Sequence, residues 1–366
     1  MSKQRYANND NQSDAAAPAT TSAQQAVPAH TAAGLLTAND AALQHYLHSA
    51  TADNTRKAYR SAIRQFEKWG GRLPCLQEEL IRYLLDKAMQ LNPRTLNLHL
   101  TAISQWHKVQ QLANPADSPL VMKTMEGIRR NHGRPKQKAR ALRLEHIARM
   151  LQQLHSEPDS LRKSRDIALL LTGFFGAFRR SELVAIRIED LQWESEGLTI
   201  ILPRSKTDQN GRGLQRALPF GPEGICPARA IRSWIKAAGI ASGPLFRAIN
   251  RWGQLGEQTL NPASVNDCLK RIGAACGFDF LPELSSHSLR RGMSTSAARE
   301  QVAFELIKKQ GGWQSDATVW EYIEEGRRYT DNAGTVLMNK LSTLQQSTAQ
   351  TTAGAEQDSQ SESGAG

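Results

Sequence analysis

A cationic stretch with almost no apolar residues divides this chain into two segments of different character. Residues 129–140 read Arg-Arg-Asn-His-Gly-Arg-Pro-Lys-Gln-Lys-Ala-Arg. Gly133 and Pro135 discourage a continuous helix, and the stretch has too few apolar residues to form a core. We therefore expect residues 131–140 to be an extended basic linker between two folded domains. A solvated surface loop is the alternative, because charge density alone does not identify a linker.

The segment before the linker, residues 36–130, has the periodicity of helices. Apolar residues recur every three or four positions, as at Ala62, Phe66 and Trp69. Pairs of Asn and Pro punctuate the segment where one helix would end and another begin. These features predict a compact all-helical N-terminal domain.

The segment after the linker, residues 141–342, mixes helical and extended patterns. The apolar runs 198–202 and 214–218 flank a turn-rich stretch, which predicts two antiparallel strands joined by a hairpin. Helical patterns precede and follow them. The predicted fold class is therefore mainly α, with an all-helical N-terminal domain and a mixed α+β C-terminal domain that contains a small antiparallel sheet.

The two ends of the chain have a different composition from the segments between them. Residues 1–35 and 343–366 are rich in small and polar residues and contain few large apolar ones. Such segments cannot bury enough surface to fold. We expect both to be disordered tails.

The charge of the chain favours a polyanionic partner. The formal net charge is +11 and the sequence pI is about 9.7. This balance is typical of proteins that bind nucleic acid, with a merely basic soluble protein as the alternative. No apolar run approaches the roughly 20 residues that span a membrane, and no signal peptide is evident. We expect a cytoplasmic protein with no membrane partner.

The sequence predicts no cofactor and no metal. The four cysteines form no Cys-x-x-Cys pair, so neither a zinc site nor a redox motif is indicated. There is also no Gly-x-x-x-x-Gly-Lys-Ser/Thr loop and no compelling carboxylate cluster for Mg²⁺.

Several residues of the second segment are suited to chemistry on a phosphate. Arg179 and Arg290 can bind phosphate oxygens through bidentate guanidinium groups. His287 lies three residues before Arg290, on the same face of a predicted helix, and can move protons near neutral pH. The indole of Trp313 donates a hydrogen bond, and the hydroxyl of Tyr322 can attack phosphorus. Each residue alone has an ordinary alternative, such as a surface ion pair or core packing.

Further cations surround these residues in the sequence. Lys206 lies in the turn-rich stretch between the two predicted strands, where it could donate a proton to a departing oxygen. A charged loop in solvent is the leading alternative for this lysine alone. The candidate contacts to a nucleic-acid backbone are Arg129, Arg130, Arg134, Lys136, Lys138, Arg140, Arg204 and Arg212.

In this order and at these spacings the motifs resemble those of the tyrosine recombinase (phage integrase) family. The resemblance covers most of residues 37–342. Gly-Ala-Phe-Arg-Arg-Ser-Glu-Leu, around Arg179, resembles the family's first arginine box, and His-Ser-Leu-Arg-Arg-Gly, from His287, resembles the second. Gly-Gly-Trp, nine residues before Tyr322, resembles the terminal box. Many members have His in place of Trp313, and the surrounding sequence is most similar to the Cre-like branch.

The resemblance implies a role for each site residue. Tyr322 would be the nucleophile, leaving a 3′-phosphotyrosine and a free 5′-hydroxyl. Arg179 and Arg290 would hold the non-bridging phosphate oxygens, and His287 would assist proton transfer. Tyr329 is the competing nucleophile, but it fits the family spacing badly.

Three supporting roles also follow from the resemblance. Trp313 would donate a hydrogen bond to the phosphate, Lys206 would protonate the leaving 5′ oxygen, and Glu182 would orient its neighbours. No metal would be needed, because guanidinium groups would stabilise the charge.

The family resemblance further implies a site-specific DNA recombinase. Its partner would be double-stranded DNA carrying a recombination site, held in a C-shaped clamp of the two domains, with a homotetramer on two sites. Residues 331–341 could form a helix that docks on a neighbouring protomer or packs on its own domain. The alternatives are a type IB-like topoisomerase and a catalytically silent DNA-binding protein.

Overall fold

The computed structural model describes residues 51–135, 137–202 and 213–346. The chain divides into two compact units, residues 1–136 and 137–366. The division falls inside the predicted linker. Residues 131 and 132, which we expected to be extended, are instead the end of a helix.

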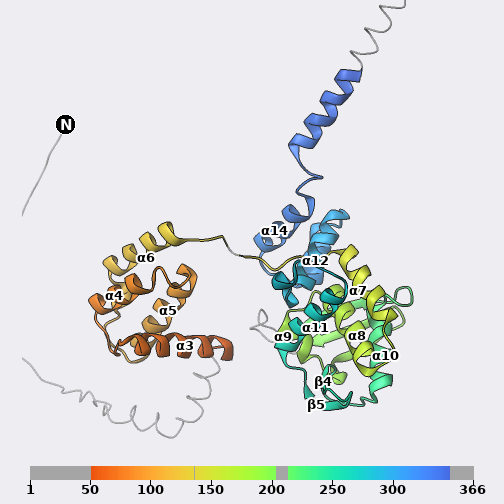
Figure 1. Ribbon diagram of the computed structural model, residues 1–366, viewed down its shortest axis with the longest axis horizontal. Helices are drawn as coiled ribbons and strands as arrows, with labels where there is room; N and C mark the ends of the chain where they lie inside the picture. Colours follow the sequence, from red (N-terminus) through yellow and green to blue (C-terminus); the bar gives the residue numbers. More distant parts are fainter. Residues whose placement is uncertain (1–50, 136, 203–212, 347–366) are drawn as a thin grey trace, which may run out of the picture. The chain divides into compact units, whose positions relative to one another are not determined.

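The first unit contains four α-helices among its described residues, shown in orange and yellow in Figure 1. These are α3 (Asp53–Trp69), α4 (Gln77–Lys87), α5 (Pro93–Val109) and α6 (Pro119–His132), with a short 3₁₀ helix η1 (Pro115–Asp117) before α6. α3 packs on α5, and α4 packs on α6. The prediction of an all-helical unit agrees with this part of the chain.

Polar side chains followed by proline begin two of these helices. The side chain of Asn92 accepts a hydrogen bond from the backbone N–H of Arg94 at 2.9 Å, with Pro93 in the first helical position of α5. Ser118 caps α6 in the same way, ahead of Pro119. Proline suits this position because its missing N–H would have had no partner inside the helix.

The core of the first unit is apolar and encloses two buried histidines, His99 and His107. Phe66, Leu80 and Leu96 are fully buried. The hydroxyl of Tyr83 is hydrogen-bonded to Nδ1 of His99 at 2.7 Å, and both side chains are buried. A hydrogen bond of this kind compensates for removing both groups from water.

The second unit consists of helices around two small sheets. Its helices are α7 (Leu144–Ser156), α8 (Leu161–Phe175), α9 (Arg180–Ala185), α10 (Pro227–Ala238), α11 (Pro262–Ala275), α12 (Ser286–Arg299), α13 (Phe304–Gly311) and α14 (Asp316–Arg327), with short 3₁₀ helices η2 (Ile188–Asp190) and η3 (Leu281–Glu283). α8 is the central helix, because it packs on α7, α9, α10 and α12. Its buried residues explain why its sequence is apolar on more than one face.

The larger sheet has the strand order β1-β2-β3 and is antiparallel. The strands are β1 (Leu191–Trp193), β2 (Gly197–Leu202) and β3 (Leu214–Pro219), and Ile200 lies opposite Arg216. Strands β2 and β3 are the predicted pair. Strand β1 and a second two-stranded sheet, β4 (Arg247–Ile249) with β5 (Leu255–Thr259), were not predicted.

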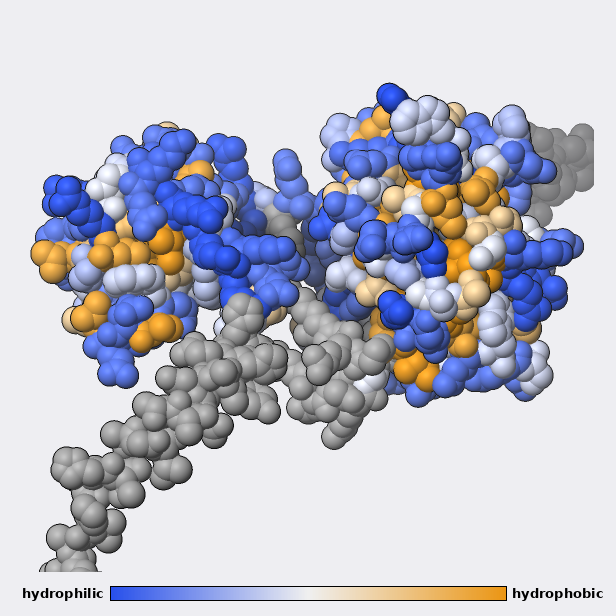
Figure 2. Space-filling view, turned by 90° about the horizontal axis from the view of Figure 1, so that it is seen from below, coloured by the Kyte–Doolittle hydropathy of each residue, from blue (hydrophilic) through white to orange (hydrophobic). Residues whose placement is uncertain are grey.

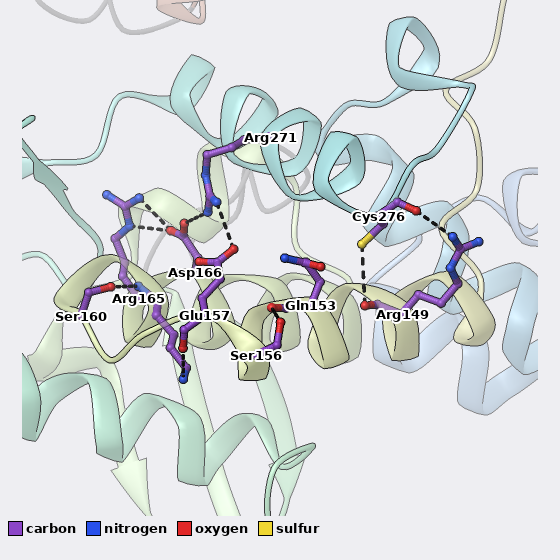
Figure 3. Close-up of polar contacts among 10 residues, drawn as sticks. Arg149, Gln153, Ser156, Glu157, Ser160, Arg165, Asp166, Arg271 and Cys276 are labelled. Atoms are coloured by element: carbon purple, nitrogen blue, oxygen red, sulfur yellow. Dashed lines mark hydrogen bonds and ion pairs between the residues drawn. The ribbon is translucent and has the colours of Figure 1, made fainter.

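A network of charges around the buried Asp166 connects α8, α11 and the end of α7 (Figure 3). Asp166 of α8 is fully buried and pairs with its neighbour Arg165 at 2.7 Å and with Arg271 of α11. Arg271 also pairs with Glu157, which follows α7, at 3.5 Å. Because a buried carboxylate is costly without partners, this network fixes α8 against α11.

A helix over residues 333–346 ends the described chain, at the blue end of Figure 1. It runs beyond residue 342, where we expected the disordered tail to begin. Val336, Leu337, Leu341 and Leu344 of this helix are each more than half exposed. On the face shown in Figure 2, both units are largely hydrophilic, with several apolar areas. No helix among the described residues is long and apolar enough to cross a membrane.

Candidate active site

A sharp turn between α8 and α9 determines the position of Arg179. α8 ends at Phe175, and Ala177 has a left-handed backbone with a φ of 47°, which is uncommon for a residue with a side chain. Phe178 is buried, and Arg179 is the N-cap residue of α9. The side chain of Arg179 therefore projects from the junction between α8 and α9.

Glu182 holds Arg179 through two contacts. One carboxylate oxygen accepts a hydrogen bond from the backbone N–H of Arg179 at 2.9 Å, and the other pairs with its Nη1 at 2.6 Å. The first contact is one half of a capping box, which begins α9. Glu182 is only 5% exposed. We propose that Glu182 acts by orienting Arg179.

Arg290 reaches the same turn from α12. It is 3% exposed, and its Nη1 donates a hydrogen bond to the backbone carbonyl of Ala177. Among the described residues, Nη2 of Arg290 has no hydrogen-bond partner. An unpartnered N–H on a buried guanidinium group is suited to an anionic oxygen.

Two glycines allow Trp313 to pack closely against Arg290. α13 ends at Gly311, and Gly312 has a left-handed φ of 59°. A Cβ atom at Gly311 would overlap the indole ring of Trp313. The ring is 8% exposed, and Cζ of Arg290 lies 4.2 Å from its centroid. This cation–π contact links the terminal box to the second arginine.

Tyr322 of α14 lies against the indole ring of Trp313. The ring centroids of Tyr322 and Trp313 are 5.3 Å apart, and Cζ of Arg291 lies 5.9 Å from the tyrosine ring. Tyr322 is half-buried. Tyr329 lies beyond the end of α14 and is 79% exposed. The structure therefore joins Tyr322, rather than Tyr329, to the Arg290–Trp313 pair.

His287 lies in the first turn of α12 and is exposed, whereas Arg290 on the next turn is buried. The two side chains therefore differ in their access to a ligand. The predicted site residue Lys206 and the candidate DNA contacts Arg204 and Arg212 lie outside the described residues.

The cations of the predicted linker are in different environments. Arg129 and Arg130 are exposed in the last turn of α6, where Arg130 pairs weakly with Glu126 at 3.8 Å. Arg134 is also exposed, and Lys136 lies outside the described residues.

The last part of the linker is bound to the second unit. Lys138 forms an ion pair with Glu321, the residue before Tyr322. The guanidinium of Arg140 lies over Phe280, 5.2 Å from the ring centroid. We expected both cations to be available to DNA, and the structure gives each a partner within its own unit.

Arg216 is a member of this cluster that we did not include among the predicted site residues. It is 2% exposed on β3, and a Cβ atom at Gly312 would overlap its guanidinium group. The alternation of side chains along β3 indicates that Arg216 is buried. Residues two apart on a strand share a face, and Leu218, two residues after Arg216, is fully buried.

A basic stripe on α3 was also absent from the predicted contacts. Lys57, Arg60, Arg64 and Lys68 are exposed and follow each other at helical spacing. Residues three or four apart lie on one face of a helix, so periodicity among the charged residues would have revealed the stripe.

The buried arginines of the cluster remain cationic at neutral pH. Burial and the neighbouring Arg179 lower the pKa of Arg290 to about 10, while Glu182 and Tyr322 oppose the change. Burial likewise lowers the pKa of Arg216 to about 10, and Glu182 opposes the change. Three guanidinium groups therefore surround one carboxylate in this part of the molecule.

The second unit has the fold of an integrase-type unit. The chain belongs to the phage integrase (tyrosine recombinase) family, whose model matches residues 140–327. It is 37% identical to an integrase/recombinase XerD homolog of Selenomonas ruminantium, over 80% of this chain and 88% of that protein. It is 26% identical to the recombinase Cre of Escherichia phage P1, over 75% of this chain and 84% of that protein. The predicted family is confirmed.

A solved structure supports the fold. The XerH site-specific recombinase, in a post-cleavage complex with a palindromic difH substrate, matches with a TM-score of 0.56. The match covers 77% of this chain and 79% of that chain at 16% identity, which supports the likeness of fold alone.

Proposed function

We propose that this protein is a site-specific DNA recombinase that cleaves and rejoins strands through a 3′-phosphotyrosine. The observation that carries this proposal is the convergence of three segments far apart in the sequence. Arg290 contacts both the turn before Arg179 and the indole of Trp313, and Tyr322 packs on the same indole. The relatives are recombinases by name, which supports the same activity.

The proposed reaction consists of two transesterifications. Tyr322 loses its proton, with the help of His287, as its Oη attacks phosphorus; the bond from phosphorus to the 5′ oxygen breaks, and that oxygen takes a proton from Lys206. The 5′-hydroxyl of another strand then gives its proton to Lys206 and attacks the phosphotyrosine; the bond from phosphorus to Oη breaks, and Tyr322 regains a proton. The energy of the broken bond is kept in the ester, so the sequence of steps needs no nucleotide.

The arginines would act on both the nucleophile and the phosphate. A tyrosine in water has a pKa of about 10 and is a poor nucleophile at neutral pH. Cations near its oxygen favour the phenolate, and the same cations stabilise the charge that grows on the phosphate oxygens. Trp313 and His287 would donate further hydrogen bonds to those oxygens.

The test of the function is capture of a covalent complex. Purified protein is incubated with labelled DNA from the region around its gene, and the reaction is stopped with SDS. We expect an SDS-resistant adduct at a defined sequence. A silent DNA-binding protein would give no adduct, and a type IB-like topoisomerase would relax supercoiled DNA without two specific sites. Since the substrate is DNA, we infer a cytoplasmic, nucleoid-associated protein.

Both units would grip the duplex. The stripe Lys57, Arg60, Arg64 and Lys68 on α3 provides a cationic face on the first unit. Arg129, Arg130 and Arg134 are further exposed cations, at and just after the end of α6. Such groups bind the phosphate backbone and determine position, whereas base contacts determine sequence.

The cations of the linker should differ in how much each contributes to the salt dependence of DNA binding. Each neutralised phosphate adds about 0.9 to the slope of log affinity against log salt. Replacing Arg134 and Lys136 together with Ala should therefore flatten the slope by nearly 2 units. Lys138→Ala is the matched control and should change it little, because Lys138 already pairs with Glu321. Gel shifts over a series of salt concentrations measure the slopes. An unchanged slope in the double variant would mean that this stretch is a solvated loop.

Assembly into a tetramer on two DNA sites would use the helix over residues 333–346. Leu337, Leu341 and Leu344 form an exposed apolar stripe on it. An apolar groove of about 650 Å³ lies elsewhere on the same unit, lined by Phe175, Phe220, Ile225, Met293 and Val302 among others. A helix with such a stripe is stable when the stripe is buried. We propose that this helix of one protomer fills the groove of the next.

Deleting the chain after Asn332 should therefore leave a folded protein that binds one half-site but fails to pair two full sites. The physical reason is loss of the stripe that would be buried between protomers. Gel shifts on one-half-site, full-site and two-site DNA measure binding, cooperativity and pairing separately.

Two double variants of the full-length chain test the apolar stripe without shortening the protein. Leu337→Asp with Leu341→Asp should reproduce the defect, whereas Asn339→Asp with Thr343→Asp, on the opposite face, should not. Loss of folding in the truncated protein would mean that the helix packs on its own domain. Normal pairing by a folded truncation would contradict the assembly proposal.

A further inference from the structure

Arg216 lies at a position where the strand pattern calls for an apolar residue. Nη1 donates to the neighbouring carbonyl of Gln215 at 3.0 Å. In the part of the chain that the structure describes, Nε and Nη2 have no hydrogen-bond partner. A buried guanidinium group with unpartnered donors is costly to the fold, so packing alone gives no reason for this residue.

The guanidinium group supports the turn that carries Trp313. Gly312 packs so closely on it that any Cβ there would overlap it. On the adjacent side, Nε2 of Gln310 donates to the carbonyls of Phe175 at 2.6 Å and Ala217 at 3.3 Å. The Gly311–Gly312 turn is therefore fastened to β3 at two neighbouring points.

Arg216 also changes the charge balance of the cluster. Glu182 and Arg179 both act on it electrostatically, and Arg216 in turn acts on Arg290. Since Glu182 is paired with Arg179, these two groups together are nearly neutral. Arg179, Glu182 and Arg290 together have one net positive charge. Arg216 raises the net charge of the cluster to two. A phosphodiester has one negative charge, and attack by a phenolate adds a second.

We propose that Arg216 is a positioning residue for strand cleavage. It holds the Trp313 turn against the phosphate site and supplies the second positive charge that the transition state requires. This proposal rests on the proposed function. Among the described residues, it adds a group from β3 to the turn before α9, α12, the Trp313 turn and α14.

The test compares two substrates that differ in charge. Wild-type protein, Arg216→Met and Arg216→Lys are assayed for adduct formation on the mapped half-site. The scissile position is either the normal phosphodiester or a methylphosphonate, which lacks the ground-state charge. Arg165→Met is the matched control, because Arg165 is buried but pairs with Asp166 outside the cluster.

We expect Arg216→Met to slow cleavage of the phosphodiester at least about tenfold, with a much smaller loss on the methylphosphonate. Arg216→Lys should recover most of the rate, because it retains the charge. Arg165→Met should change both substrates by the same factor. If Arg216→Met does not fold, Gly312→Ala is measured instead, since its Cβ displaces the guanidinium group.

Two results would overturn the proposal. One is cleavage by Arg216→Met at the wild-type rate. The other is an equal loss on both substrates without recovery by Lys, which would reduce Arg216 to a packing residue. If Gly312→Ala is used instead, an equal loss of rate on both substrates would likewise contradict the proposal. Failure of the wild-type protein to form any adduct would instead contradict the proposed function.

Discussion

Tyr322→Phe is expected to bind DNA normally and to form no covalent adduct. The substitution removes only the hydroxyl, so the ring can keep its contacts with Trp313 and Arg291. Without the hydroxyl no ester to phosphorus can form. Adduct formation on half-site DNA is measured after SDS, and binding is measured by gel shift on the same DNA.

Tyr329→Phe is the control for this experiment. Tyr329 is 79% exposed beyond the end of α14, and its substitution should leave adduct formation unchanged. Should Tyr329→Phe lose the adduct while Tyr322→Phe retains it, the assignment of the nucleophile is wrong.

Arg290→Ala should lose on the order of 100-fold or more in the rate of cleavage while retaining most DNA binding. The guanidinium group contacts the Ala177 carbonyl and the Trp313 ring, and its Nη2 has no partner among the described residues. Removing it takes away a preorganised donor and loosens two neighbours at once. Single-turnover cleavage of half-site DNA gives the rate.

Arg299→Ala on the same helix is the matched control, because Arg299 is exposed at the end of α12. It should cleave at nearly the wild-type rate. Arg179→Ala should resemble Arg290→Ala, since both groups would hold the same phosphate. Cleavage at a near-normal rate by either site variant would remove that arginine from the proposed mechanism.

Local signals in the sequence predicted much of this fold. The β2–β3 pair followed from two short apolar runs around a turn-rich stretch, and helices such as α5 followed from apolar periodicity after an Asn-Pro pair. The arginine boxes followed from short motifs, and their convergence was expected from the family resemblance. Short-range rules of this kind act within one turn or one hairpin, so a single sequence exposes them.

Features that depend on distant partners were missed. The partners of Lys138 and Asp166 come from other helices, and periodicity does not identify such partners. Strands β1 and β4 contain three residues each, too few to show alternation. Arg216, which lies near Lys206 in the sequence, was not among the predicted site residues, and a charged residue in a strand ordinarily faces water.

The attachment of the linker has a practical consequence for exchanging DNA-binding units. The backbone N–H of Arg140 donates to the carbonyl of Glu283, and that of Leu142 donates to the carbonyl of Ser288, just after His287. With the Lys138–Glu321 pair, the segment from residue 138 onward is an integral part of the second unit. A chimera that gives this unit a new target preference should therefore be joined before Gln137. A junction at residue 141, where composition alone would suggest it, would cut contacts beside both His287 and Tyr322.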